Sequence, residues 1–143
     1  MSLTDAVADK RDQVIDDCVT LVDEEVQKKK GLGGVVIKTG YKAIRGIRPG
    51  FIRKVVSSLF DEWAVELDPF WSAAKAAGVS PKSHFEAKRD AVAEALLSVT
   101  DGKAAGAKSA LVRSTYNKLR PSAKQHVEEA VPGLATILDK HTR

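Results

Sequence analysis

Apolar residues recur at intervals of three and four along almost the whole chain of 143 residues, and no segment alternates apolar and polar residues as a strand does. This spacing places apolar side chains on one face of a helix with 3.6 residues per turn. The longest apolar runs have only a few residues, whereas a membrane-spanning helix needs about 20. The pattern predicts an all-α fold, a compact bundle of about six to seven helices in one domain over residues 1–143.

The periodicity predicts three helices in the first half of the chain. The first begins near Ser2 or Thr4 and runs until Gly31, which can adopt the left-handed conformation that terminates helices. The second spans roughly 35–47. The third has Pro49 in its first turn, where a missing backbone N–H costs nothing.

Proline and capping residues are expected to divide the second half. Asp68-Pro69 is typical of a cap and a first-turn proline, and predicts a short helix that ends at Gly78. A capping box, Ser83-x-x-Glu86, predicts a helix that ends at Asp101-Gly102. A helix to about Leu119 follows. Ser122-x-x-Gln125 then caps the last helix, which Pro132-Gly133 should kink or break.

The two halves of the chain resemble each other. The matched pairs, in order, are segments 10–14 and 88–92, Asp23 and Asp101, Tyr41 and Tyr116, and Arg48-Pro49 and Arg120-Pro121. We therefore expect two pseudo-repeated three-helix units, at about 4–67 and 83–141, joined by a connector at about 68–82. Such units would pack across a pseudo-two-fold axis, because neither alone closes a sizeable core.

These motifs also resemble a known group of proteins. A Val-rich acidic helix precedes a Gly-rich basic helix with Lys38-x-x-Tyr41, then Arg48-Pro49-Gly50 and a closing Ser-Ala-Lys-x-His-Val-Glu segment at 122–128. Over nearly the whole chain this order resembles an uncharacterised family of small all-helical bacterial proteins. The resemblance implies a compact helical domain and supplies no activity or site residue.

Charge is distributed unevenly around the net value of +4. Residues 1–25 carry eight acids and two bases, whereas residues 26–60 carry nine bases and no acid. The remaining residues carry twelve bases and eleven acids. Two interpretations stay open: the basic segment neutralises the acidic first helix, or it forms a surface for phosphate backbone, anionic lipid or an acidic partner.

The second interpretation names a basic site on residues 28–54 with a second copy later in the chain. Lys38, Lys42 and Arg45 are spaced to share one helix face. Further bases follow each Arg-Pro pair, near a helix N-terminus that already favours anions. Nucleic-acid binding would be nonspecific, since no groove-reading motif is present. The candidate residues are Lys38, Lys42, Arg45, Arg48, Arg53, Lys54, Arg120 and Lys124.

Four aromatic residues gather around the Asp68-Pro69 corner: Phe60, Trp63, Phe70 and Trp71. We expect them to wedge the two halves together, because aromatic side chains dominate core burial. The alternative is an apolar ligand slot or a dimer contact at the same place.

No catalytic, metal or cofactor site is expected. The single cysteine, Cys18, excludes an intrachain disulfide and a Cys-rich zinc site. The three histidines, His84, His126 and His141, belong to neither a Glu-x-x-His nor a His-Glu-x-x-His motif. The chain starts without a cationic and apolar leader, so a cytoplasmic protein is expected.

The leading functional expectation is a non-catalytic helical protein that acts by protein–protein contact or homo-oligomerisation. The first alternative is an anion-binding module for nonspecific nucleic acid or an anionic lipid surface. The second is a carrier of a small apolar ligand between the helical halves.

Overall fold

The computed structural model describes residues 1–142, and all regular structure in this part of the chain is helical. The prediction of an all-α fold is therefore confirmed. The elements, in order, are α1 (Leu3–Val7), the 3-10 helix η1 (Ala8–Lys10), α2 (Arg11–Gln27), α3 (Gly31–Arg45), α4 (Phe51–Ala77), α5 (Pro81–Ala87), α6 (Arg89–Ala105) and α7 (Ala110–His141).

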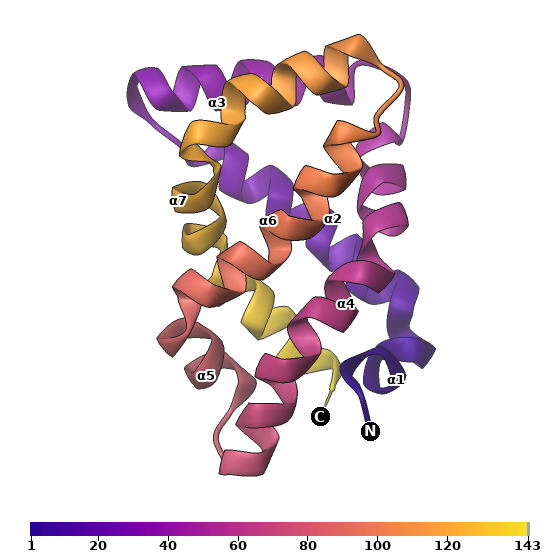
Figure 1. The fold of residues 1–143 in the computed structure, drawn as a ribbon, viewed down its shortest axis with the longest axis vertical. Coiled ribbons are helices and arrows are strands. Elements are labelled where there is room, and N and C mark those ends of the chain that lie inside the picture. Colours follow the sequence, from indigo (N-terminus) through magenta and orange to yellow (C-terminus); the bar gives the residue numbers. More distant parts are fainter. Residues whose placement is uncertain (143) are drawn as a thin grey trace.

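Two helices lie across one end of the molecule and the others run lengthwise beneath them (Figure 1). The crossing pair consists of α3 and the first part of α7, residues 110–121, which lie side by side and antiparallel. We call this pair the α3–α7 layer. Below it run α2, α4, α6 and the rest of α7, while α1, α5 and both chain ends lie at the opposite end.

The core lies between the lengthwise helices. Trp71 and Phe85 are its largest fully buried side chains, and Phe70 meets the Phe85 ring edge-on at 6.2 Å. Of the four aromatic residues around Asp68, Phe60 and Trp71 are buried in this core, whereas Trp63 and Phe70 are half-buried against it. The other buried members are Leu3, Val7, Val14, Ile15, Val56, Ala64, Leu67, Val92, Val131, Ala135 and Leu138.

The first predicted helix is divided in the structure. The 3-10 turn η1 separates α1 from α2, so that Leu3 and Val7 are buried against α4. The predicted end of the helix at Gly31 is not observed: α2 ends earlier, at Gln27, with Lys28 as its C-cap, and Gly31, with φ +75°, belongs to the start of α3. The next helix, α3, begins at Gly31 itself, four residues before the predicted start.

The prediction of a separate helix opened by Asp68-Pro69 is wrong. Helix α4 continues through Pro69 to Ala77 and ends, as predicted, at the left-handed Gly78 with φ +69°. Asp68 does not cap a following helix: its Oδ1 accepts the Leu3 N–H at 2.7 Å and the Ser72 hydroxyl at 3.3 Å. Most of the predicted connector at 68–82 is therefore the last part of α4.

Three further boundaries also differ. The cap of α5 is Ser80, which accepts the Ser83 N–H, and α6 continues past Asp101-Gly102 to Ala105. Helix α7 is continuous through Pro121 and Pro132, so the predicted helix boundary at Arg120-Pro121 is wrong. Figure 1 shows a bend in α7 where it leaves the α3–α7 layer. A proline inside a helix removes one backbone hydrogen bond and destabilises the helix by about 3 kcal/mol. Packing along both parts of α7 offsets this cost.

Three helix limits of the first half repeat in the second half at one spacing. Helices α1 and α5 begin at residues 3 and 81, and α2 and α6 span 11–27 and 89–105. Each pair of limits is separated by 78 residues, the offset that relates segments 10–14 and 88–92 in the sequence.

Candidate functional site

The α3–α7 layer joins two segments that contain no acidic residue. Residues 26–60 include α3, and residues 102–127, with six bases and no acid, include the first part of α7. The helices pack closely at Gly40, where a Cβ would lie 3.1 Å from side-chain carbons of Thr115 and Leu119. The fold thus brings the two acid-free segments together at one end of the molecule (Figure 1).

The outer surface of this layer is apolar along its middle. Exposed fractions reach 88% for Leu32, 62% for Val35 and 47% for Leu111. Val36 and Ile47 are exposed as well. At 100° per residue, Leu32, Val35 and Val36 cluster on the face of α3 opposite Gly34, which packs on Lys29, and Ile47 follows in the turn after α3. Together with Leu111 they form what we call the outer apolar stripe.

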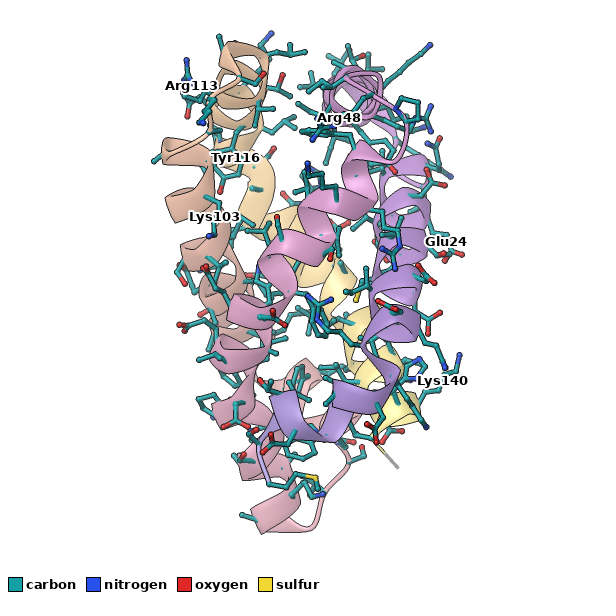
Figure 2. The ribbon with its side chains drawn as sticks, turned by 90° about the vertical axis from the view of Figure 1, so that its right-hand side faces the viewer. Glu24, Arg48, Lys103, Arg113, Tyr116 and Lys140 are labelled. Atoms are coloured by element: carbon teal, nitrogen blue, oxygen red, sulfur yellow. The ribbon has the colours of Figure 1, made fainter. Side chains whose placement is uncertain are left out.

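Basic side chains lie on both sides of the outer apolar stripe. Lys38, Lys42 and Arg45 share the flank of α3 that faces away from α7, and exposed Arg113 and Lys118 lie on α7. Figure 2 shows the layer nearly end-on, with Arg48 and Arg113 at this end and Lys140 toward the other. Within residues 1–142, no carboxylate pairs with Lys38, Lys42 or Lys118.

The eight predicted anion-binding residues do not form one site. Arg53 pairs with Asp16 at 2.8 Å and with Asp12 at 3.8 Å, while Arg45 lies 3.9 Å from Asp23. Charge compensation by the acidic α2 therefore accounts for this part of the basic segment.

The two residues of the predicted second copy are also paired. Lys124 bonds to Asp90 at 2.6 Å and Glu94 at 2.9 Å, and both carboxylates raise the pKa of Lys124. Arg120 pairs with Asp101. Four of the eight residues have no carboxylate partner within the described part of the chain: Lys38, Lys42, Arg48 and Lys54.

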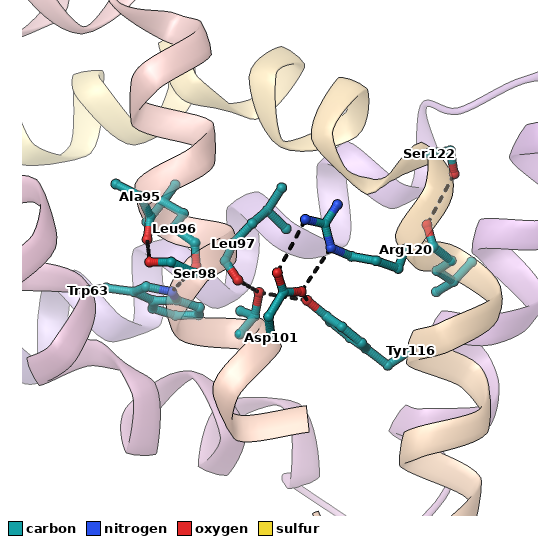
Figure 3. A network of polar contacts seen from close by, with 11 residues as sticks. Trp63, Ala95, Leu96, Leu97, Ser98, Asp101, Tyr116, Arg120 and Ser122 are labelled. Atoms are coloured by element: carbon teal, nitrogen blue, oxygen red, sulfur yellow. Dashed lines mark hydrogen bonds and ion pairs between the residues drawn. The ribbon is translucent and has the colours of Figure 1, made fainter. Parts of the chain in front are cut away.

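A hydrogen-bonded cluster around Asp101 fastens α7 to α6 (Figure 3). The Arg120 guanidinium donates to both carboxylate oxygens, at 2.8 and 3.2 Å, and the Tyr116 hydroxyl donates to Asp101 and lies 3.0 Å from Thr100 Oγ1. Arg120 and Tyr116 hold the pKa of Asp101 below its usual value. Burial, followed by Asp101, raises the pKa of Tyr116.

A related cluster fastens α3 to α2. Burial and the neighbouring Asp23 raise the pKa of Tyr41, and Arg45, four residues later, is the ion-pair partner of Asp23. Tyr116 and Arg120 are likewise four residues apart. Each helix of the α3–α7 layer thus places a Tyr and an Arg, four residues apart, beside an aspartate of a lengthwise helix; we call these groups the two Asp–Tyr–Arg clusters.

Beneath the layer lies a cavity of about 250 Å³ between α2, α6 and α7. Only Trp63 of the four predicted aromatic residues lines it, and its indole N–H donates to the Leu96 carbonyl at 3.2 Å. The remaining lining residues are Cys18, Leu21, Val22, Glu25, Val26, Lys29, Ile37, Leu96, Leu97, Thr100, His126, Val127, Ala130, Val131 and Leu134.

Charged groups are concentrated at one part of this cavity. Lys29 is only 7% exposed, with its ammonium group 2.5 Å from Glu129 and 3.8 Å from Glu25. Glu25 Oε2 and His126 Nδ1 are buried and have no hydrogen-bond partner within residues 1–142. Burial and the Lys29 charge lower the pKa of His126. An unpaired buried polar atom typically costs about 1–3 kcal/mol.

The residue spacing near the end of α2 contains a signal for this cluster. Cys18, Val22, Glu25 and Lys29 follow one another at intervals of four, three and four, so both charged residues continue the inward face of α2. Residues 61–143 carry nearly equal numbers of acids and bases, so their net charge does not reveal the acid-free segment 102–127.

Burial raises the pKa of the Cys18 thiol to about 12, which leaves it protonated at neutral pH. In the described part of the chain, no three His, Cys, Asp or Glu side chains are grouped as a metal site requires. None of the described helices is both long and apolar enough to cross a membrane.

Comparison with known proteins identifies the family. Searches among curated proteins and among solved structures found no significant match. The sequence model of a family of unknown function, DUF6918, matches residues 3–142. This match agrees with the expected membership in an uncharacterised family and covers nearly the whole chain, and the protein therefore belongs to the DUF6918 family.

Proposed function

We propose that this protein is a non-catalytic module that binds reversibly to negatively charged membrane surfaces through the α3–α7 layer. One observation carries the proposal: the two acid-free segments of the chain meet on a surface whose middle is apolar and whose flanks are basic.

This arrangement fits a membrane–water interface. A helix lying in the plane of a membrane buries its apolar face at the level of the head groups and keeps its lysines at the edges. Leu32, Val35 and Leu111 would enter the interface, and Lys42 and Lys118 would contact lipid phosphates. Each basic residue near an anionic leaflet contributes about 1 kcal/mol, so a few suffice for salt-sensitive binding.

The same surface is less suited to the other partners considered. Nucleic acid needs positive charge but gives exposed aliphatic side chains nothing to bury against. Self-association through this face would bring like charges of two copies together, which costs free energy. We therefore place an anionic lipid surface ahead of nucleic acid and ahead of a homo-oligomer.

We also infer that the two halves arose by duplication. The spacing of 78 residues shared by three helix limits and the two Asp–Tyr–Arg clusters support this inference. Duplication would explain why corresponding helices, α3 and the first part of α7, form one layer.

Vesicle sedimentation tests the proposal. We expect binding to vesicles of phosphatidylcholine with about 30% phosphatidylglycerol, no binding to pure phosphatidylcholine, and release between ~0.05 and ~0.5 M NaCl. Lys42→Gln with Lys118→Gln should weaken binding roughly tenfold or more. The matched control, Lys82→Gln with Lys88→Gln near α5, removes the same charge and should bind as the wild type does.

The apolar component is tested separately by Leu32→Ser with Val35→Ser. These side chains are exposed, so the fold should be unaffected, while vesicle binding should fall. Absence of binding at low salt would refute the proposal. Equally tight, salt-sensitive binding to DNA that the serine variant leaves unchanged would assign the layer to nucleic acid instead.

A further inference from the structure

We propose that a polar pocket on the flank of the α3–α7 layer, between α6 and the first part of α7, binds the phosphate group of a small organic phosphate ester. The pocket has a volume of about 340 Å³ and is open to solvent. Figure 2 shows two of its lining residues, Arg113 at the level of the layer and Tyr116 below it. The inference does not rest on membrane binding, because none of the lining residues belongs to α3 or to the outer apolar stripe.

The polar side chains of α7 that line the pocket lie on one face of the helix. Arg113, Tyr116, Asn117 and Arg120 are three, four and seven residues from the first, so they point to the same side. Segment 38–45 of α3 has a base, a tyrosine and an arginine at the same intervals. In both copies the tyrosine and the arginine serve an aspartate, whereas the first base has no carboxylate partner within residues 1–142. In the second copy this leaves Arg113 available to a ligand.

Both arginines are held by protein acceptors and keep further donors for a ligand. Arg120 binds Asp101 through Nε and Nη2, at 2.8 and 3.2 Å, and its Nη1 has no acceptor within residues 1–142 (Figure 3). Arg113 Nη1 donates to the Ala107 carbonyl, and its Nε and Nη2 have no acceptor in the same range. The side-chain amide of Asn117 also lacks a partner among these residues. Guanidinium groups that are fixed in advance lose less conformational entropy when a ligand binds.

The charges around the pocket favour an anion. Asp101 is the one carboxylate among the lining residues, and both of its oxygens accept from Arg120. The charge of Glu94 also acts on Arg120, but Glu94 pairs with Lys124 at 2.9 Å. Two guanidinium groups against one carboxylate leave a positive charge, and the neighbouring segment 102–127 contains no acid to cancel it.

The number of free donors and the available room select a phosphate ester. A carboxylate offers two oxygens, whereas a phosphate group offers three, enough for two guanidinium groups and an amide. Ligand pockets span roughly 300–1,000 Å³, so a volume of about 340 Å³ holds a small organic molecule rather than an inorganic ion alone. Ala104 and Ala105 complete the wall and would contact the carbon skeleton of the ester.

Titration with glycerol 3-phosphate tests the assignment. At about pH 8 its phosphate group is a dianion, because the second pKa of a phosphate ester is about 6. We would follow the amide NMR shifts of residues 104–120 and expect saturable binding. Glycerate, which has a carboxylate in place of the phosphate, should bind roughly fivefold or more weakly, and glycerol should not bind.

Two pairs of variants separate a specific pocket from general attraction between charges. Arg113→Gln should weaken glycerol 3-phosphate binding about tenfold or more, whereas Arg89→Gln, exposed at the far end of α6, removes the same charge and should have no effect. Ala104→Leu narrows the pocket without changing its charge and should weaken binding as well. Its control, Ala91→Leu, makes the same change at an exposed position of α6 and should bind as the wild type does.

Vesicles identify the source of the phosphate. Phosphatidic acid presents a phosphate monoester on a lipid, so a lipid ligand predicts a preference for its vesicles over phosphatidylglycerol vesicles of equal charge, lost in Arg113→Gln. Binding of glycerol 3-phosphate without this preference would identify a soluble ester. Loss of vesicle binding with intact glycerol 3-phosphate binding would refute the membrane proposal alone.

The phosphate site is overturned if neither glycerol 3-phosphate nor phosphatidic acid binds in a manner that depends on Arg113 more than on Arg89. It is also overturned if glycerate binds as tightly as glycerol 3-phosphate.

Discussion

Gly34 of α3 packs directly on the backbone of Lys29: a Cβ at Gly34 would lie 2.8 Å from the carbonyl carbon of Lys29 and 2.9 Å from its oxygen. This contact fixes the start of α3 above the end of α2. It also holds the backbone of the residue whose side chain pairs with Glu129 at the cavity. One close contact, between Gly34 and Lys29, therefore determines both where the α3–α7 layer lies and where Lys29 lies in the cavity wall.

We expect Gly34→Ala to lower the free energy of unfolding by about 1–3 kcal/mol, because backbone atoms cannot move aside as a flexible side chain can. Its neighbour provides the control, since a Cβ at Gly33 meets nothing within 4 Å. Gly33→Ala should instead stabilise the protein by about 0.5–1 kcal/mol, through the helical preference of alanine. Urea unfolding of both variants measures the difference, and equal effects would contradict the packing argument.

Asp68 should stabilise the protein through α1, to which it is linked across 65 residues. Replacing it by alanine leaves the Leu3 N–H without its acceptor, and we expect Asp68→Ala to cost about 1–2 kcal/mol. Faster amide hydrogen exchange within α1 should accompany this loss. Glu66→Ala on the exposed face of the same helix should change stability by less than about 0.5 kcal/mol.

The Tyr116–Asp101 hydrogen bond should contribute about 1 kcal/mol to stability. In a double-mutant cycle of Tyr116→Phe and Asp101→Asn, each single change should destabilise the protein, and the double change should cost less than their sum. The pKa of Asp101 is lowered in the folded state. The stabilisation should therefore be present above about pH 4 and disappear as the pH falls through the lowered pKa. Strict additivity would show that the two side chains do not interact.

His126 should make the protein less stable in mild acid. Its pKa is lowered by burial and by Lys29, with Glu129 acting in the opposite direction, so the unfolded chain takes up the proton first. The stability that neutral His126 contributes is fully present above about pH 6.5, the usual pKa of histidine. It is lost as the pH falls below that value. Between about pH 7.5 and pH 5.5, the wild type should lose more stability than His126→Phe. Parallel stability curves would exclude this role.

Local patterns predicted the helical class and the helix end at Gly78, since a left-handed glycine acts within a few residues. They failed where a residue acts on a distant element. Asp68 looks like the cap of its own helix but receives the N–H of Leu3. Pro69, Pro121 and Pro132 predict helix limits locally, yet tertiary packing keeps α4 and α7 continuous.

The candidate sites were predictable only in part. The basic segment 28–54 was visible, but the carboxylates that neutralise Arg53 become evident only when α2 and α4 are placed together. Glu25 and Lys29 belong to charged segments of the sequence, yet their spacing from Cys18 and Val22 continues the inward face of α2. The aromatic cluster indicated a slot near Phe60, whereas the cavity lies on the other side of Trp63, among aliphatic residues.

The position of α7 sets the order in which this chain can fold during synthesis. Helices α2, α3, α5 and α6 all pack against α7, which is made after them. At a translation rate of about 5–20 residues per second, the 32 residues of α7 take about 2–6 s to synthesise. During this interval the apolar faces of α2 and α6 on the nascent chain have no α7 to cover them. Those faces are where a ribosome-associated chaperone would bind.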